Sequence, residues 1–177
     1  LSRNIGNKKI FPFACITCLF IIGIASIAVA AGYNGECWVV NGSGNGEIVK
    51  VTSKGEIDPN IISGFEQPQY AIVNPKDGAL WVSDSAAASV FKFSFGGTEP
   101  VQVKFTGGQR PRSISIDPTD GSAWVGADTT VGEEGDVQKG SVVKIFPDGK
   151  KQQVATGISG EVYVSVNTTD GSCWVAD

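Results

Sequence analysis

Residues 113–125 read SISIDPTDGSAWV, and this stretch decides the fold because related stretches recur along the chain. Residues 70–82 read YAIVNPKDGALWV, residues 163–175 read YVSVNTTDGSCWV, and residues 35–39, GECWV, match its last part. Each complete stretch has an alternating run, an Asp-Gly turn and a second run that contains a tryptophan. Alternation predicts a half-buried strand, and Asp-Gly between two apolar runs is a strong hairpin signal. The sequence therefore predicts the same β-hairpin several times over.

Two further runs complete each unit. A third apolar run carries one lysine in the same phase, in residues 48–51, 90–93 and 142–145. A glycine-containing turn and a fourth apolar run follow, as in residues 101–105. Four short antiparallel strands in a unit of about 43 residues are typical of a β-propeller blade.

We therefore predict an all-β fold, a partial β-propeller over residues 32–177 with about three and a half four-stranded blades of an incomplete ring. The blades are centred on the four tryptophans, Trp38, Trp81, Trp124 and Trp174. A β-sandwich also has short strands but has no reason to repeat its sequence, and a parallel solenoid needs shorter repeats. The chain starts without methionine and ends inside a unit, so we expect the N-terminal portion of a longer protein whose later residues supply the innermost strand of the first blade.

The repeated pattern resembles the NHL-type repeat of six-bladed propellers. The pattern is Pro-x-x-Ile-x-x-Asp-Pro-x-Asp-Gly-x-x-Trp-Val-x-x-Asp, followed by Val-x-Lys-aromatic and a glycine turn. Residues 68–93 and 111–145 match it best, with departures at Asn74, Asn167 and Thr168 and an insertion around residues 131–140. This resemblance implies the fold of the mature region. It does not imply one activity, because propellers of this sort carry many unrelated functions.

Residues 1–31 predict export. They carry Arg3, Lys8 and Lys9, no acidic residue, and an apolar run over residues 10–31 that ends in small side chains. A cleaved signal peptide fits this order of features, and an uncleaved membrane anchor is the alternative, since 22 mostly apolar residues suffice to cross a bilayer about 30 Å thick. Either reading places residues 32–177 outside the cytoplasm: periplasmic, extracellular or on the cell surface.

Charge and histidine content narrow the choice of partner. The whole chain has a net charge of −4, and without the three basic residues of the first segment the net charge is −7. This argues against nucleic acid as a partner, and it leaves membrane contact to residues 10–31. The chain contains no histidine, which excludes the usual general base and the usual zinc ligand set within these residues. Cys37 and Cys173 occupy equivalent positions three units apart, so we expect no disulfide between them.

Two sets of polar residues are candidates for a site. Asn41, Asp84, Asp128 and Asp177 follow the tryptophan strands and offer oxygen ligands for Ca²⁺, although each also suits a turn-capping role. Asn74, Asp117 and Asn167 end the innermost strands, near the expected channel, and are candidates for binding a polar ligand, with a turn role as the alternative.

The remaining signals point to packing and to a loop. The tryptophans are expected to pack between blades, and the lysines of the third runs to be solvated or paired with carboxylates. The insertion places Glu133, Glu134 and Asp136 in a loop that is a candidate partner-binding surface. We predict an exported binding or scaffolding module for a protein or polymer, more a binder than an enzyme, with no evident cofactor. The alternatives are a Ca²⁺-dependent lactonase-like hydrolase and a membrane-anchored sensor ectodomain.

Overall fold

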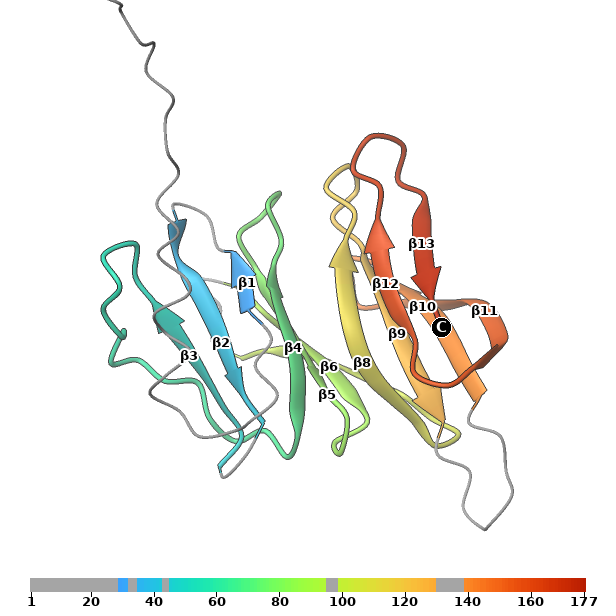
Figure 1. Ribbon diagram of the computed structural model, residues 1–177, viewed down its shortest axis with the longest axis horizontal. Coiled ribbons are helices and arrows are strands. Elements are labelled where there is room, and N and C mark those ends of the chain that lie inside the picture. Colours follow the sequence, from blue (N-terminus) through green and yellow to red (C-terminus); the bar gives the residue numbers. More distant parts are fainter. Residues whose placement is uncertain (1–28, 32–34, 43–44, 95–98, 130–138) are drawn as a thin grey trace, which may run out of the picture.

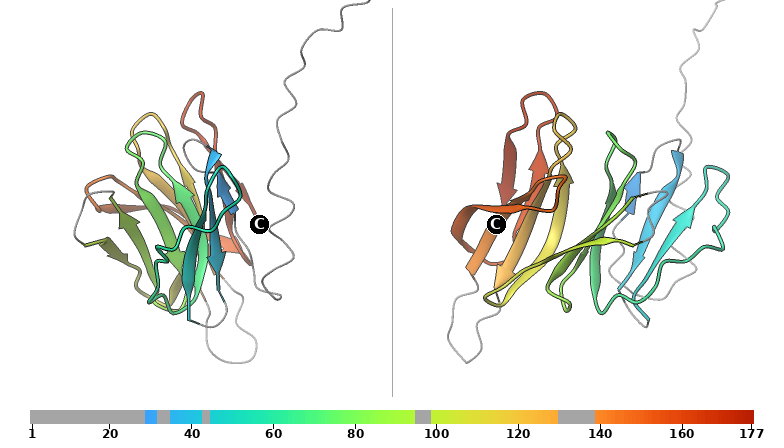
Figure 2. Two further views of the ribbon diagram at one scale, coloured as in Figure 1. Left: turned by 90° about the vertical axis from the view of Figure 1, so that its left-hand side faces the viewer. Right: turned by 180° about the vertical axis from the view of Figure 1, so that it is seen from behind.

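A computed structural model of the chain describes residues 29–31, 35–42, 45–94, 99–129 and 139–177. The regular structure of these residues consists of antiparallel β-strands in four separate sheets. Figure 1 shows the sheets side by side, each turned relative to the one before it, and Figure 2 shows the same order from two other directions. None of the described residues form a helix with the length and apolar character needed to span a membrane.

Each sheet is one blade, and its strands follow one another in chain order. Blade 1 contains β1 (Val29–Ala31), β2 (Cys37–Asn41) and β3 (Glu47–Val51). Blade 2 contains β4 (Pro68–Val73), β5 (Leu80–Asp84), β6 (Ser89–Phe93) and β7 (Val101–Lys104). Blade 3 contains β8 (Gln109–Ile116), β9 (Ala123–Thr129), β10 (Lys139–Ile145) and β11 (Lys151–Ser159). Blade 4 contains β12 (Tyr163–Val166) and β13 (Cys173–Ala176).

The hairpin between the first two strands of a blade is built the same way three times. In blade 3 the amide of Gly121 donates to the carbonyl of Asp117 at 2.8 Å. The amide of Asp117 donates to the carbonyl of Ser122 at 2.9 Å. The turn glycines 78, 121 and 171 have φ between +73° and +78°, a conformation that favours glycine over any residue with a side chain. The Asp-Gly signal in the sequence thus has its physical cause in this turn.

The innermost strands β1, β4, β8 and β12 contact one another in sequence order, which sets the blades around a common side (Figure 1). The expectation that another part of the chain supplies the first innermost strand is wrong for this structure, because Val29–Ala31 pairs antiparallel with Cys37–Val39. Those three residues are the described part of residues 1–31, and the export role of that segment stays a prediction.

The core lies between neighbouring blades. Trp81 is 1 % exposed and packs with residues of blade 3 such as Ile114 and Val125, while Trp38 packs with Ala71 and Val82 of blade 2. The predicted inter-blade role is confirmed for these two rings. Trp174 differs, with 72 % of its surface exposed, because no other described blade packs against its face of blade 4. Cys37 lies on β2 and Cys173 on β13, and no disulfide joins these two residues.

The lysine of each third strand lies directly across from the tryptophan of the second. In blade 3, Lys144 pairs in register with Trp124, and its ammonium lies 5.1 Å from the centre of the ring and 3.0 Å from a carboxylate oxygen of Asp120. Burial raises the pKa of Asp120, but hydrogen bonds from Ser122 and the ammonium of Lys144 outweigh it and lower the pKa to about 2. Lys50 with Trp38 and Lys92 with Trp81 repeat this arrangement. These lysines therefore pair with carboxylates, one of the two roles expected for them.

Candidate functional site

The two predicted sets of site residues lie at opposite ends of the blades. Asn74, Asp117 and Asn167 follow the first strands, at the upper end in Figure 1. Asp84 and Asp128 lie at the ends of the second strands β5 and β9, and Asp177 follows β13, all at the other end of the blades, where the first strands begin. They do not form one site.

Asn74, Asp117 and Asn167 organise turns. Each accepts a hydrogen bond through its side-chain Oδ1 from the amide two residues later, at 2.9–3.0 Å. The buried Asn74 also donates its Nδ2 to the carbonyl of Gly121 in the next blade, at 3.2 Å. In Asp117, Oδ1 accepts from the hydroxyl of Thr119 as well, at 2.5 Å. These contacts fix the hairpins and join blades 2 and 3, and a ligand role for the three residues stays a prediction.

Asp84 and Asp177 fasten the end of the second strand to the chain that enters the first strand. The buried Asp84 accepts the amides of Glu66 and Gln67 at 2.7 and 2.9 Å, and the amide of Ala87 at 3.0 Å. Asp177 accepts the amide of Ser159 at 3.2 Å, which repeats the bond to Glu66 at the corresponding place in blade 4. Among the described residues no three His, Cys, Asp or Glu side chains lie close enough together to hold a metal ion. The proposed calcium ligands are thus not brought together here.

Asp128 has a different role. It lies four residues after its tryptophan, where Asp84 lies three after, and β9 is seven residues long where β5 has five. Its side chain is fully buried, and its Oδ2 accepts a 2.9 Å hydrogen bond from Nε of Arg112, whose Nη2 lies 2.9 Å from the same oxygen. Its Oδ1 is buried and has no hydrogen-bond partner among the described residues.

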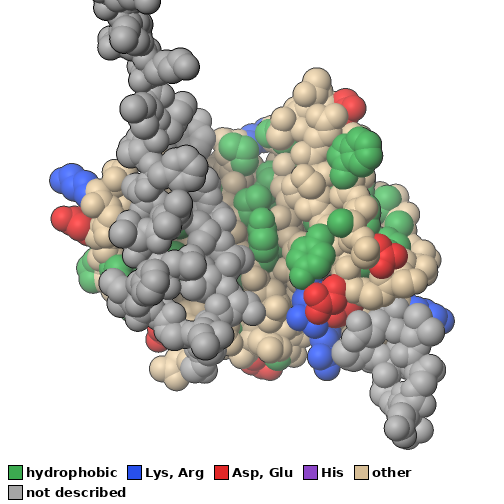
Figure 3. Space-filling model, viewed as in Figure 1, with side chains coloured by type: hydrophobic (Ala, Val, Ile, Leu, Met, Phe, Trp, Pro, Cys, Tyr) green, Lys and Arg blue, Asp and Glu red, His purple; other side chains and the backbone are tan. Residues whose placement is uncertain are grey.

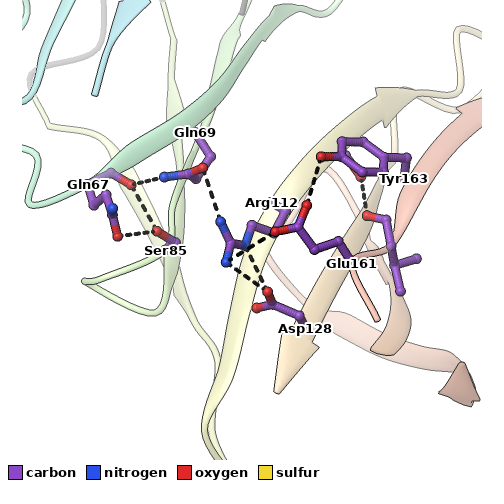
Figure 4. Close-up of polar contacts among 9 residues, drawn as sticks. Gln67, Gln69, Ser85, Arg112, Asp128, Glu161 and Tyr163 are labelled. Atoms are coloured by element: carbon purple, nitrogen blue, oxygen red, sulfur yellow. Dashed lines mark hydrogen bonds and ion pairs between the residues drawn. The ribbon is translucent and has the colours of Figure 1, made fainter. Parts of the chain in front are cut away.

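Arg112 is the centre of a polar cluster that reaches three blades, as Figure 4 shows. Its Nη1 donates to Oε1 of Gln69 on β4 at 3.4 Å, and its Nη2 lies 3.9 Å from Oε1 of Glu161, next to β12. The hydroxyl of Tyr163 donates to Oε2 of Glu161 at 3.1 Å. This hydrogen bond, with the negative charge of Glu161, raises the pKa of Tyr163 above its usual value. We call Gln69, Arg112, Asp128, Glu161 and Tyr163 the Arg112 cluster.

The row of polar side chains continues into blade 2. The hydroxyl of Ser85 donates to the backbone carbonyl and to Oε1 of Gln67, at 3.2 and 3.0 Å. Gln69 donates to the same carbonyl at 3.5 Å (Figure 4). Ser85 is buried and Gln69 half-buried, so this edge of the innermost strands is polar where the middle of the blades is apolar.

Sequence reasoning identified Asp128 but missed Gln69, Arg112, Glu161 and Tyr163. One signal was available, since Arg112 places a charge in an innermost strand where the second and fourth units have Gln69 and Val162. Glu133, Glu134 and Asp136 lie outside the described residues, and their role in partner binding stays a prediction. The described residues next to that insertion are Thr129 and Lys139, and Thr129 pairs with Gln109 at the start of β8.

No protein-family model matches the chain, and no curated protein matches it. Among solved structures, it is similar to one of a nidogen/laminin complex, with a TM-score of 0.67 and 14% identity over 85% of this chain and 56% of that chain. An auxiliary nutrient binding protein from Bacteroides thetaiotaomicron follows with a TM-score of 0.59 and 8% identity, over 86% of this chain and 36% of that one. A streptogramin B lyase structure has a TM-score of 0.48 and 21% identity, over 84% and 61%.

These similarities concern the fold. The structural neighbours are β-propeller proteins, so the propeller architecture predicted from the repeat is confirmed. The chain spans little more than half of the nidogen/laminin chain that it matches.

Proposed function

We propose that this chain is part of an exported binding propeller, and that it contacts its partner at the end of the blades that holds the Arg112 cluster. The proposal is supported by the place where blade 3 departs from the repeat. Arg112 and the displaced Asp128 lie at this one end, and the insertion follows Thr129 in the sequence. In repeat proteins, insertions and departures from the pattern on one face commonly build the binding surface.

The chemistry of the described residues favours binding over catalysis. The cluster offers a guanidinium, two carboxylates, an amide and a phenol, which suit recognition of a polar partner by hydrogen bonds and charge. Two structural neighbours are described as a protein complex and as a nutrient binding protein, which gives this architecture a precedent for binding. A protein or polymer partner outside the cytoplasm also accords with the export signal predicted for residues 1–31.

An affinity enrichment tests this proposal. The 177-residue chain is immobilised and incubated with secreted and cell-surface proteins and polymers, and the retained material is quantified. The test variant combines Arg112→Gln with Asp128→Asn, which removes the ion pair without leaving one buried charge. The control is Thr169→Ala, an exposed residue in a turn at the opposite end.

We expect the control to retain a partner that the double variant, folded by circular dichroism, holds at least about tenfold more weakly. Equal retention by all three proteins would remove this end from the binding surface. Hydrolysis of lactones or esters by the chain, lost on substitution of Asn74 and Asp117, would instead favour an enzyme. A Glu133→Gln, Glu134→Gln, Asp136→Asn variant tests the predicted loop separately.

A further inference from the structure

The innermost strands of blades 2 and 3 each carry one extra residue at the end that holds the Arg112 cluster. The pairing of β4 with β5 shifts register at Gln69, and the pairing of β8 with β9 shifts register at Arg112. Each of these residues therefore forms a β-bulge, which turns a side chain out of the regular alternation and is common next to active sites. The corresponding residue of blade 4, Val162, is fully buried, and its Cγ2 lies 2.1 Å from where a Cβ of Gly140 would be.

The two bulge side chains meet and continue a row of polar groups. Nη1 of Arg112 donates to Oε1 of Gln69 at 3.4 Å, and Nε2 of Gln69 donates to the carbonyl of Gln67 at 3.5 Å. The hydroxyl of Ser85 donates to Oε1 of Gln67 at 3.0 Å. Figure 4 shows these side chains side by side across blades 2 and 3. We call Gln67, Gln69, Ser85 and Arg112 the bulge row.

The side chains of the bulge row keep hydrogen-bonding capacity for a ligand. Both bonds of the Gln69 carboxamide, at 3.4 and 3.5 Å, are longer than the usual N–H···O range of about 2.7–3.2 Å. A carboxamide has two N–H donors and two acceptor lone pairs, and a guanidinium has five N–H donors. The row can therefore exchange its long internal bonds for bonds to a group that both donates and accepts.

The positive charge of Arg112 is already compensated. Its Nε and Nη2 both lie 2.9 Å from Oδ2 of Asp128, and the other members of the bulge row are uncharged. Oε1 of Glu161 lies 3.9 Å from the same Nη2, so a second negative charge is close by. The row thus does not need an anion for charge balance, and Glu161 opposes one.

The bulge row is accessible, and its exposure is set by strands on both sides of it. Gln67 is exposed, Gln69 is half-buried and the Arg112 side chain is 25% exposed. The strand that carries Gln69, β4, contacts β1 and β8, and the strand that carries Arg112, β8, contacts β4 and β12. Figure 3 shows basic and acidic side chains together at the lower middle of this face, the end where the row lies.

The bulge row has no exposed hydrophobic anchor. Protein interfaces usually depend on a few aromatic or other large side chains that are buried at their centre. The large hydrophobic side chains that are exposed in the described residues lie after β3, on the outer strands β7 and β11, and on blade 4: Ile57, Ile61, Val101, Val154, Tyr163, Trp174 and Val175. The row therefore suits a partner that is recognised by hydrogen bonds.

We infer that the bulge row binds the hydroxyl groups of a neutral carbohydrate chain. This inference rests on the proposed binding function and narrows the protein or polymer partner to a polysaccharide. A sugar hydroxyl both donates and accepts, which matches the mixed carboxamide and guanidinium groups of the row. The net charge of −7 outside residues 1–31 favours a neutral chain over an acidic one.

Calorimetric titration of three neutral hexasaccharides, cellohexaose, xylohexaose and mannohexaose, into the 177-residue chain tests the inference. We expect at least one to bind, and Gln69→Leu to weaken that binding about fivefold because its hydrogen bonds are lost. Gln67→Leu, at a more exposed position, should weaken it about threefold. The matched control is Gln153→Leu, the same substitution at an exposed position of β11, with affinity unchanged within about twofold. Circular dichroism checks that each variant is folded.

Side-chain N–H signals provide a readout that a purely structural role would not change. The carboxamide signals of Gln67 and Gln69 in a nitrogen–proton correlation spectrum are assigned by their loss in the two leucine variants. Saturating hexasaccharide should shift both signals, while the signal of Gln153 stays in place, because only the first two lie in the row. Binding that leaves both signals unchanged would place the sugar elsewhere and reject the inference.

Two further probes distinguish carbohydrate from other partners. Acetylated and amidated hexaserine is a neutral peptide with hydroxyl groups, and if it binds as tightly as the sugar, with the same loss in Gln69→Leu, the row recognises peptides instead. Tighter binding of hexagalacturonate than of every neutral sugar would show that the row reads negative charge. Failure of all three neutral hexasaccharides would reject this inference alone, because the enrichment with the Arg112→Gln/Asp128→Asn variant tests the binding function without assuming the partner's chemistry.

Discussion

Blades 2 and 3 use an aspartate differently at the same end of the same strand. In blade 2, Asp84 accepts three backbone amides and closes the blade on itself. In blade 3, β9 is two residues longer, Asp128 lies one residue further from its tryptophan, and it pairs with a side chain, Arg112, instead. The comparison teaches that a shift of one residue moves an aspartate from hydrogen bonds with backbone amides to an ion pair with a side chain.

A second difference between the two blades lies one strand position earlier. The hydroxyl of Ser83 on β5 donates to the carbonyl of Arg112 at 2.7 Å. The corresponding residue of β9 is Gly126, and the corresponding carbonyl, that of Val162, accepts from Ser113 at 2.9 Å. A Cβ at Gly126 would lie 2.2 Å from that carbonyl oxygen. At this contact between blades, serine in blade 2 donates to the carbonyl of the next blade, whereas glycine in blade 3 leaves room for that carbonyl to approach the backbone.

The largest effect is expected for Asp84→Ala. The change removes a buried carboxylate and leaves three amides without their acceptor, and hydrogen bonds to a charged group contribute about 1.5–3 kcal/mol each. We expect a loss of about 4 kcal/mol in the free energy of unfolding, measured by urea denaturation. A loss below about 1 kcal/mol would mean that water replaces the carboxylate and that Asp84 does not close the blade.

Gly126→Ala is expected to cost somewhat less, about 3 kcal/mol, because the methyl group would meet backbone that cannot move cheaply. Ser83→Ala in blade 2 removes a single hydrogen bond and should cost about 1 kcal/mol. Thermal unfolding of the two variants measures the difference. Similar costs would show that the approach of blade 4 to Gly126 is looser than the contact between blades 2 and 3.

A double-mutant cycle measures the interaction between Arg112 and Asp128, which has no counterpart at Asp84. Arg112→Met leaves Asp128 buried without a counter-charge and should cost about 2–3 kcal/mol. Adding Asp128→Leu should recover about 1–2 kcal/mol of that loss, since neither charge then remains. Asp84 has no such rescue, because its partners are backbone amides. Strictly additive losses in the urea denaturation of the three variants would contradict a direct interaction between Arg112 and Asp128.

The fold could be predicted from the sequence because the local strand and turn signals agreed with the repeat. The alternating runs, the Asp-Gly turns and the repeated tryptophan all indicated one blade, and Trp38 and Trp81 are buried between blades as expected. The innermost strand of the first blade could not be foreseen, because residues 29–31 read as the end of an export segment.

The candidate site was harder to read. The recurrence of Asp84, Asp128 and Asp177 suggested equal roles, whereas the roles depend on what each side chain contacts: backbone amides for Asp84 and Asp177, and Arg112 for Asp128. The Arg112 cluster joins residues more than 40 positions apart, such as Gln69 with Arg112 and Arg112 with Glu161. Such contacts follow from how the blades pack, and the spacing within one unit does not contain them.

The smallest effect concerns the turns that follow the compared aspartates. Blade 2 closes with the short turn Ser85–Ala88, in which Ala88 has φ of +46°, while blade 3 carries the insertion at this place. A left-handed conformation costs an alanine about 1–2 kcal/mol, and the added freedom of glycine in the unfolded chain costs about 0.5–1 kcal/mol. Ala88→Gly should therefore stabilise the protein by about 0.5 kcal/mol.

Ala86→Gly, at an exposed neighbour without a positive φ, is the control and should destabilise the protein by about 0.5–1 kcal/mol. Both variants replace one alanine with glycine, so the difference between their unfolding midpoints reports the strain at Ala88. Equal midpoints would mean that the turn of blade 2 is unstrained.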